Sequence, residues 1–130
     1  MKALKYAPLV AGGLLGFVFV ASGIVYFLKL VAMPPPPTGS PAAMFMGALM
    51  PTGYMDFIKV IEILGGLMVA VPKTRNFGLL CLGPIIVNIV AFHAFINKGA
   101  GLFDPPLLVI GLLALYLLWN DRRRFAGLLN

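Results

Sequence analysis

Hydrophobic residues fall in four long blocks that are separated by short segments rich in proline, glycine or charge. The blocks predict helices over about 7–31, 55–71, 77–96 and 105–121. Each is close to the roughly 17–25 residues that a helix needs to cross a bilayer. We therefore predict an all-α membrane protein, a bundle of four transmembrane helices that forms a single domain over residues 1–130.

Local signals refine the ends of these blocks. Pro72 closes the second block, and Gly83-Pro84 predicts a kink within the third. Asp104 precedes two prolines at the start of the fourth block. An aspartate can cap a helix and proline is tolerated in its first turn, so we expect Asp104 to be the N-cap.

The one long connection, residues 33–54, carries its own pattern. The run Pro34–Pro37 predicts an extended, polyproline-like chain. Ser40 followed by Pro41 is typical of a helix start. Residues 42–50 are apolar and uncharged but too few to span a bilayer. We expect a short apolar helix that lies on the outer surface or covers the bundle as a lid.

Composition agrees with the block pattern. Hydrophobic residues make up 61% of the chain and charged residues 11%, whereas soluble domains have about 45–50% and about 25%. The net charge of +6 comes from residues at the ends of the apolar blocks. No basic stripe is interleaved with aromatic residues, which excludes nucleic acid as the partner. The partner that this composition predicts is the lipid bilayer.

The basic residues also predict an orientation. The connections on one side contain only Lys98, and those on the other side contain seven basic residues: Lys2, Lys5, Lys73, Arg75, Arg122, Arg123 and Arg124. Cytoplasmic connections of membrane proteins carry the excess of Lys and Arg. We therefore predict that both termini are cytoplasmic and that residues 33–54 lie outside.

Ionisable side chains within a span cost at least about 2.5–3.5 kcal/mol at its centre, so they usually face the interior of the bundle and pair. Counted along the predicted helices, the polar residues all fall in the outer half of the membrane. The candidate cluster consists of the ionisable Lys29, Lys59, Glu62 and His93 with the neutral Ser22, Tyr26 and Asn88.

Helical spacing groups part of this cluster. One stripe holds Ser22, Tyr26 and Lys29, and a second helix presents Lys59 and Glu62 three residues apart. Asn88 and His93 lie five residues apart, about 140° around their helix, so spacing alone does not direct both to one cavity. Two small-residue pairs predict close helix approach: Gly12 with Gly16, and Gly65 with Gly66.

Each candidate also has a purely structural interpretation. Lys29 can snorkel from a helix end, and Lys59 with Glu62 can form a local ion pair. His93 can be an interfacial histidine that is satisfied by the backbone. Met44, Met46 and Met50 suit an adaptable apolar surface more than a ligand site.

No pattern indicates a catalytic or electron-transfer site within the chain itself, so whether it is an enzyme stays open. One histidine with one buried glutamate is too small a set for a metal site. The single cysteine, Cys81, excludes an intramolecular disulfide and a two-cysteine redox motif. We expect it to be a small apolar residue of a helix.

Four segments together resemble the DoxX-like family of small bacterial membrane proteins. They are Ser22–Lys29, Gly53-Tyr54 leading into Lys59–Gly66, Pro84–His93 and Leu115–Trp119. The resemblance covers nearly the whole chain. It implies a four-helix bundle in the bacterial cytoplasmic membrane.

The resemblance also implies a functional setting. Family members are often linked to redox systems, including thiosulfate–quinone oxidoreductases and complexes that handle thiol stress. Because the sequence shows no electron-transfer site, we expect an accessory subunit of a larger, redox-associated membrane assembly. Such a subunit would carry no cofactor of its own and would assemble with other membrane proteins or with further copies of itself. The alternative is a subunit that binds a quinone or another small amphipathic ligand at the polar cluster.

Overall fold

The computed structural model describes residues 2–32 and 34–129. Residue 33 of the predicted outer connection, and the first and last residues of the predicted domain 1–130, lie outside this part of the chain. Over the described residues the secondary structure is helical, and no strand occurs among them. The predicted all-α class is confirmed.

Eight helical elements follow one another in the described chain. The first six match the four predicted blocks and the short helix between the first two, and the last two lie beyond the predicted end of the fourth block. In chain order the eight elements are α1 (Lys2–Leu28), α2 (Pro41–Leu49), α3 (Tyr54–Ala70), α4 (Arg75–Ala91), the π-helical turn η1 (Phe92–Ile96), α5 (Pro105–Asn120), α6 (Arg122–Ala126) and the 3₁₀ turn η2 (Gly127–Leu129).

The first predicted helix is too long at its outer end. α1 ends at Leu28 because Lys29 adopts a left-handed backbone conformation with φ of 53°. The Leu30 N–H then donates to the Val25 carbonyl oxygen at 3.2 Å, a bond that closes the helix end. The predicted block reaches residue 31 because apolar residues continue beyond the helix.

Two predicted helix starts have different outcomes. Ser40 caps α2 as predicted, since its Oγ accepts a hydrogen bond from the Ala43 N–H at 3.1 Å and Pro41 occupies the first turn. Asp104 occupies the N-cap of α5, but its side chain makes no cap hydrogen bond. An N-cap side chain accepts a hydrogen bond from the backbone N–H of the second or third residue of the helix. In α5 the second residue is Pro106, which has no N–H, so one of these two donors is missing.

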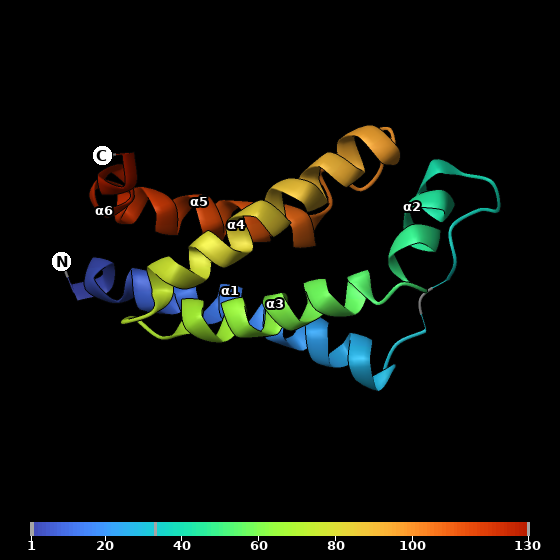
Figure 1. Cartoon of the computed structure of the whole chain (residues 1–130). Helices are drawn as coiled ribbons and strands as arrows, with labels where there is room; N and C mark the ends of the chain where they lie inside the picture. Colours follow the sequence, from blue (N-terminus) through green and yellow to red (C-terminus); the bar gives the residue numbers. More distant parts are fainter. Residues whose placement is uncertain (1, 33, 130) are drawn as a thin grey trace.

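The long helices form one bundle. α1 lies along α3, α3 along α4, and α5 contacts both α1 and α4. Figure 1 shows both chain termini at one end of the bundle and α2 at the opposite end. The helices lie together near the termini and spread apart toward α2 (Figure 1).

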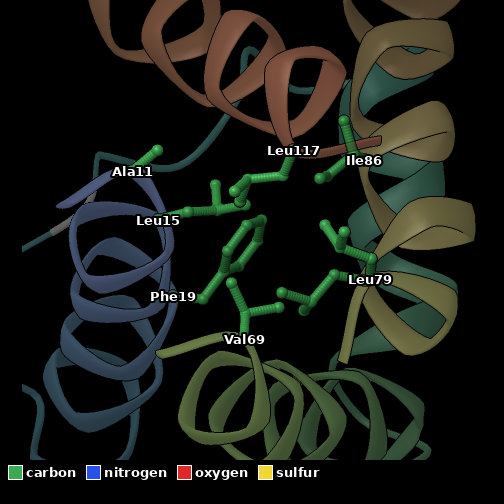
Figure 2. Packing of buried hydrophobic residues seen from close by; sticks show 8 residues of the cluster. Ala11, Leu15, Phe19, Val69, Leu79, Ile86 and Leu117 are labelled. Carbon is green, nitrogen blue, oxygen red and sulfur yellow. The ribbon is translucent and has the colours of Figure 1, made fainter. Parts of the chain in front are cut away.

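A buried apolar core fills the tightly packed half of the bundle. Figure 2 shows side chains from α1, α3, α4 and α5 that converge on Phe19. Leu15, Val69 and Leu82 are completely buried. Gly16 and Gly66 lie in direct contact across α1 and α3, and Gly65 lies against Leu82 of α4. The predicted close approach of small residues is therefore confirmed.

The outer surface of the bundle is strongly apolar. Phe17 of α1, Leu112 of α5 and Phe95 of η1 are 71%, 66% and 81% exposed. The segments Lys5–Leu28 and Arg75–Ile96 are long and apolar enough to cross a membrane. Two helices of this kind support an association with membranes. α5 and α3 are shorter, with 16 and 17 residues, and α3 also carries three charged residues.

Candidate functional site

A cavity of about 580 Å³ opens between α2, the first half of α3, the second half of α4 and η1. It lies at the end of the bundle where the helices spread apart. Most of its wall is apolar, including Phe45, Phe57 and Phe92. The polar side chains in the wall come from α3, α4 and η1, and they are Tyr54, Lys59, Glu62, Asn88 and His93.

Glu62 is the most deeply buried charged group near the cavity. It is 4% exposed, and its Oε2 lies 2.9 Å from Lys59 Nζ one helical turn earlier. The two atoms form an ion pair, so Lys59 partners this oxygen of the carboxylate, while no described group donates a hydrogen bond to Oε1. A buried carboxylate in this position is expensive unless a further donor approaches it.

Lys59 connects this pair to α1. Its Nζ donates a hydrogen bond to Ser22 Oγ at 3.1 Å and lies 5.7 Å from the centre of the Tyr26 ring. The ammonium group is therefore shared between Glu62, a hydroxyl and an aromatic face. Four of the predicted cluster residues, from α1 and α3, meet here.

Tyr26 has a second role that helical spacing did not indicate. Its hydroxyl donates to Asp56 Oδ1 at 2.8 Å and approaches Met50 Sδ at 3.7 Å. Asp56 lies three residues before Lys59 on the same helix face, which is the signal that could have added it to the cluster. The contact joins the end of α1 to the start of α3 and to the residue that follows α2.

Lys29 does not join this cluster. It lies beyond the end of α1, is exposed, and is absent from the cavity wall. Since the helix stops at Leu28, the stripe through Ser22 and Tyr26 is not continued to Lys29. Its position agrees with the interpretation of a lysine that extends from a helix end.

His93 and Asn88 both line the cavity, despite the five residues between them. His93 Nδ1 donates to the Ile89 carbonyl oxygen at 2.8 Å, because a carbonyl can only accept. Asn88 Nδ2 likewise donates to the Pro84 carbonyl oxygen at 2.9 Å. In the neutral imidazole this leaves Nε2 as an acceptor, and the amide Oδ1 of Asn88 is a second one.

The short helix α2 covers one side of the cavity. Phe45, Met46 and Leu49 contribute to the wall. The Phe45 ring lies 5.1 Å from that of Phe92 and so joins α2 to η1. Of the other two methionines of this segment, Met44 is 66% exposed and Met50 contacts Tyr26.

This arrangement can bind a small molecule. Among the described residues, no three His, Cys, Asp or Glu side chains come together in a way that could hold a metal ion. What the cavity offers is a large apolar wall with one buried ion pair and several hydrogen-bond acceptors.

Comparison with known proteins gives one relative and no assignment of function. The uncharacterized protein YwoB of Bacillus subtilis (strain 168) is 37% identical over 75 residues, which are 58% of this chain and 47% of YwoB. The chain thus spans about half the length of the curated relative that it matches. No protein-family model matches the chain, and no solved structure gives a significant match. The resemblance to DoxX-like proteins stays a prediction.

Proposed function

We propose that the chain is a multi-pass protein of the bacterial cytoplasmic membrane, in which α1, α3, α4 with η1, and α5 cross the bilayer. The exposed apolar exterior supports this proposal, because a soluble protein rarely exposes large contiguous apolar patches. Exposed basic residues at the end that holds the termini support a cytoplasmic position for that end: Lys5, Lys73, Arg122, Arg123 and Arg124.

In this setting the protein binds a small amphipathic ligand in the cavity beside α2. The observation that carries the proposal is the cavity itself, about 580 Å³ in volume, with Glu62 and His93 in an otherwise mainly apolar wall. Ligand sites typically have volumes of about 300–1,000 Å³ and place a few polar groups within apolar walls. Quinones belong to this class of ligand, and so do their reduced forms, which carry hydroxyl groups in place of the carbonyl groups.

A second candidate function is that of an accessory subunit in a larger, redox-associated membrane assembly. The observation that favours it is the direct bonding within the cluster, where Lys59 contacts both Ser22 and Glu62. Such a network fixes the packing of α1 on α3 without any ligand. The chain would then contribute a stable membrane surface to partner subunits or to further copies of itself.

Native mass spectrometry of the protein in mild detergent distinguishes the two functions. We expect a small-molecule adduct that is lost in Ile58→Trp, since Ile58 lines the cavity. Val60→Trp is the matched control, because Val60 is on the same helix, is 45% exposed and lies outside the cavity wall. A stoichiometric protein partner without any adduct would instead favour the accessory subunit.

A further inference from the structure

We propose that the cavity selects a neutral ligand with a hydroxyl donor, a phenol or an alcohol on an apolar body, over ligands whose polar group only accepts hydrogen bonds. This inference rests on the proposed ligand-binding function and specifies its ligand class. Its basis is the balance of hydrogen-bond donors and acceptors that the cavity wall leaves unused.

The strongest unused acceptor is the Glu62 carboxylate. Its Oε2 is paired with Lys59 Nζ at 2.9 Å, whereas its Oε1 accepts no hydrogen bond from the described residues, and the side chain is only 5% exposed. A hydroxyl that reaches a buried carboxylate forms a charge-assisted hydrogen bond, which is about twice as strong as a neutral one. A carbonyl or ether oxygen in the same place would face the carboxylate with a lone pair and gain nothing.

Two further acceptor atoms also favour a ligand that donates a hydrogen bond. His93 Nδ1 and Asn88 Nδ2 donate to backbone carbonyls, so His93 Nε2 and Asn88 Oδ1 are left. The unused donors are weaker or already engaged: the second amide hydrogen of Asn88, the hydroxyl of the half-exposed Tyr54, and an ammonium group shared between Ser22 and Glu62. The cavity wall therefore favours a ligand whose polar group donates a hydrogen bond.

The charges near the cavity restrict the donor to a neutral group. Lys59 Nζ lies 2.9 Å from Glu62 Oε2, so a second ammonium group at the carboxylate would meet a like charge at short range. An anionic ligand would meet the carboxylate itself. A hydroxyl satisfies the carboxylate and adds no charge, while its apolar body contacts the aromatic wall of Phe45, Phe57 and Phe92.

A matched series of probes tests the proposal on the intact protein in detergent. The series is 4-hexylphenol, its methyl ether 4-hexylanisole, hexylbenzene and 4-hexylbenzylamine, each measured by calorimetric titration. The variant Ile58→Trp, in which the larger side chain fills the cavity, measures the heat of probe partitioning into micelles. This heat is subtracted from that of the unmodified protein. We expect the phenol to bind at least tenfold more tightly than the ether, which corresponds to about 1.4 kcal/mol, and more tightly than the amine.

A variant pair identifies the group that is responsible. Glu62→Gln alone would leave Lys59 buried without its counter-charge, so Lys59→Gln is combined with it. We expect the preference for phenol over ether to fall to threefold or less in this double variant. Retention of the full preference would overturn the role of Glu62.

The same titrations test ligand binding in the cavity and the selectivity for a hydroxyl donor separately. Equal binding of phenol and ether to the unmodified protein, abolished by Ile58→Trp, would overturn the selectivity and leave the cavity as a ligand site. Tighter binding of 4-hexylbenzylamine than of 4-hexylphenol would overturn the restriction to a neutral donor. Binding of no probe beyond micelle partitioning would overturn the ligand-binding function as well.

Discussion

Gly66 of α3 lies so close to Gly16 of α1 that a Cβ added to Gly66 would meet the Gly16 carbonyl oxygen at 2.8 Å. The backbones of the two helices are in contact at this point. From here α1 runs toward Ser22 and α3 back toward Lys59, which are joined at 3.1 Å. The glycine contact therefore sets the helix separation on which the polar cluster depends.

Gly66→Ala is expected to destabilise the protein by about 1–3 kcal/mol, the usual cost of adding volume to a tightly packed site. The added methyl group also meets Val20 and Phe19, so separation of the helices is the main way to accommodate it. Thermal unfolding in detergent measures the loss.

Gly13→Ala is the control for this substitution. Gly13 is a helical glycine of α1, and a Cβ there meets nothing within 4 Å. Alanine has a higher helix propensity than glycine by about 1 kcal/mol, so this variant should be as stable as the unmodified protein or more stable. Equal losses in both variants would show that the contact does not limit the packing.

Glu62→Ala should lower the stability by about 3–5 kcal/mol, because it leaves Lys59 without its counter-charge at a largely buried site. Asp56→Ala should cost only about 0.5–1.5 kcal/mol, since the exposed Asp56 loses one hydrogen bond from Tyr26. Denaturation in the same detergent compares the two. Small and equal effects would mean that water reaches Glu62.

Local signals predicted the elements well. Ser40 with Pro41 marks the start of α2 because the cap involves residues within one turn of each other. The end of α1 was not predictable in this way, because it depends on the left-handed conformation of Lys29, a residue type that rarely adopts it. The apolar sequence beyond Leu28 therefore extended the predicted helix.

The site was predictable only where its contacts are local. Lys59 and Glu62 are three residues apart on one helix, so their pairing follows from helical spacing. The hydrogen bond between Tyr26 and Asp56 depends on how α1 and α3 are aligned. The cavity depends on where the connection places α2, and no periodicity within one helix contains that information.

Single-cysteine labelling tests the proposed topology. With Cys81→Ala as the background, an impermeant maleimide should label Thr38→Cys in intact cells and Gly127→Cys only after the membrane is permeabilised. Both positions are exposed, so burial does not limit the reaction. Labelling of position 127 in intact cells would contradict the cytoplasmic C-terminus.

His93→Gln tests whether this residue belongs to a ligand site or only to the packing. Glutamine has a similar volume and can donate to the Ile89 carbonyl, but it lacks the second ring nitrogen of this cavity-lining histidine. We expect the affinity for 4-hexylphenol to fall by about fivefold while the unfolding temperature is nearly unchanged. A loss of stability with unchanged affinity would assign His93 a structural role.

Tyr26→Phe should loosen the connection between α2 and α3 without disturbing the bundle. The substitution removes the hydroxyl that donates to Asp56 at 2.8 Å and approaches Met50, but it keeps the ring beside Phe27 and Lys59. The loss of one partly exposed hydrogen bond should cost about 0.5–1.5 kcal/mol. Because that bond holds the segment after α2, amide hydrogen exchange there should accelerate more than exchange in the core helices.

Tyr116→Phe is the control, since the Tyr116 hydroxyl makes no hydrogen bond with the described residues and its removal should leave exchange unchanged. If Tyr26→Phe left exchange after α2 unchanged too, α2 would be held by its apolar contacts, above all by Phe45 against Phe92.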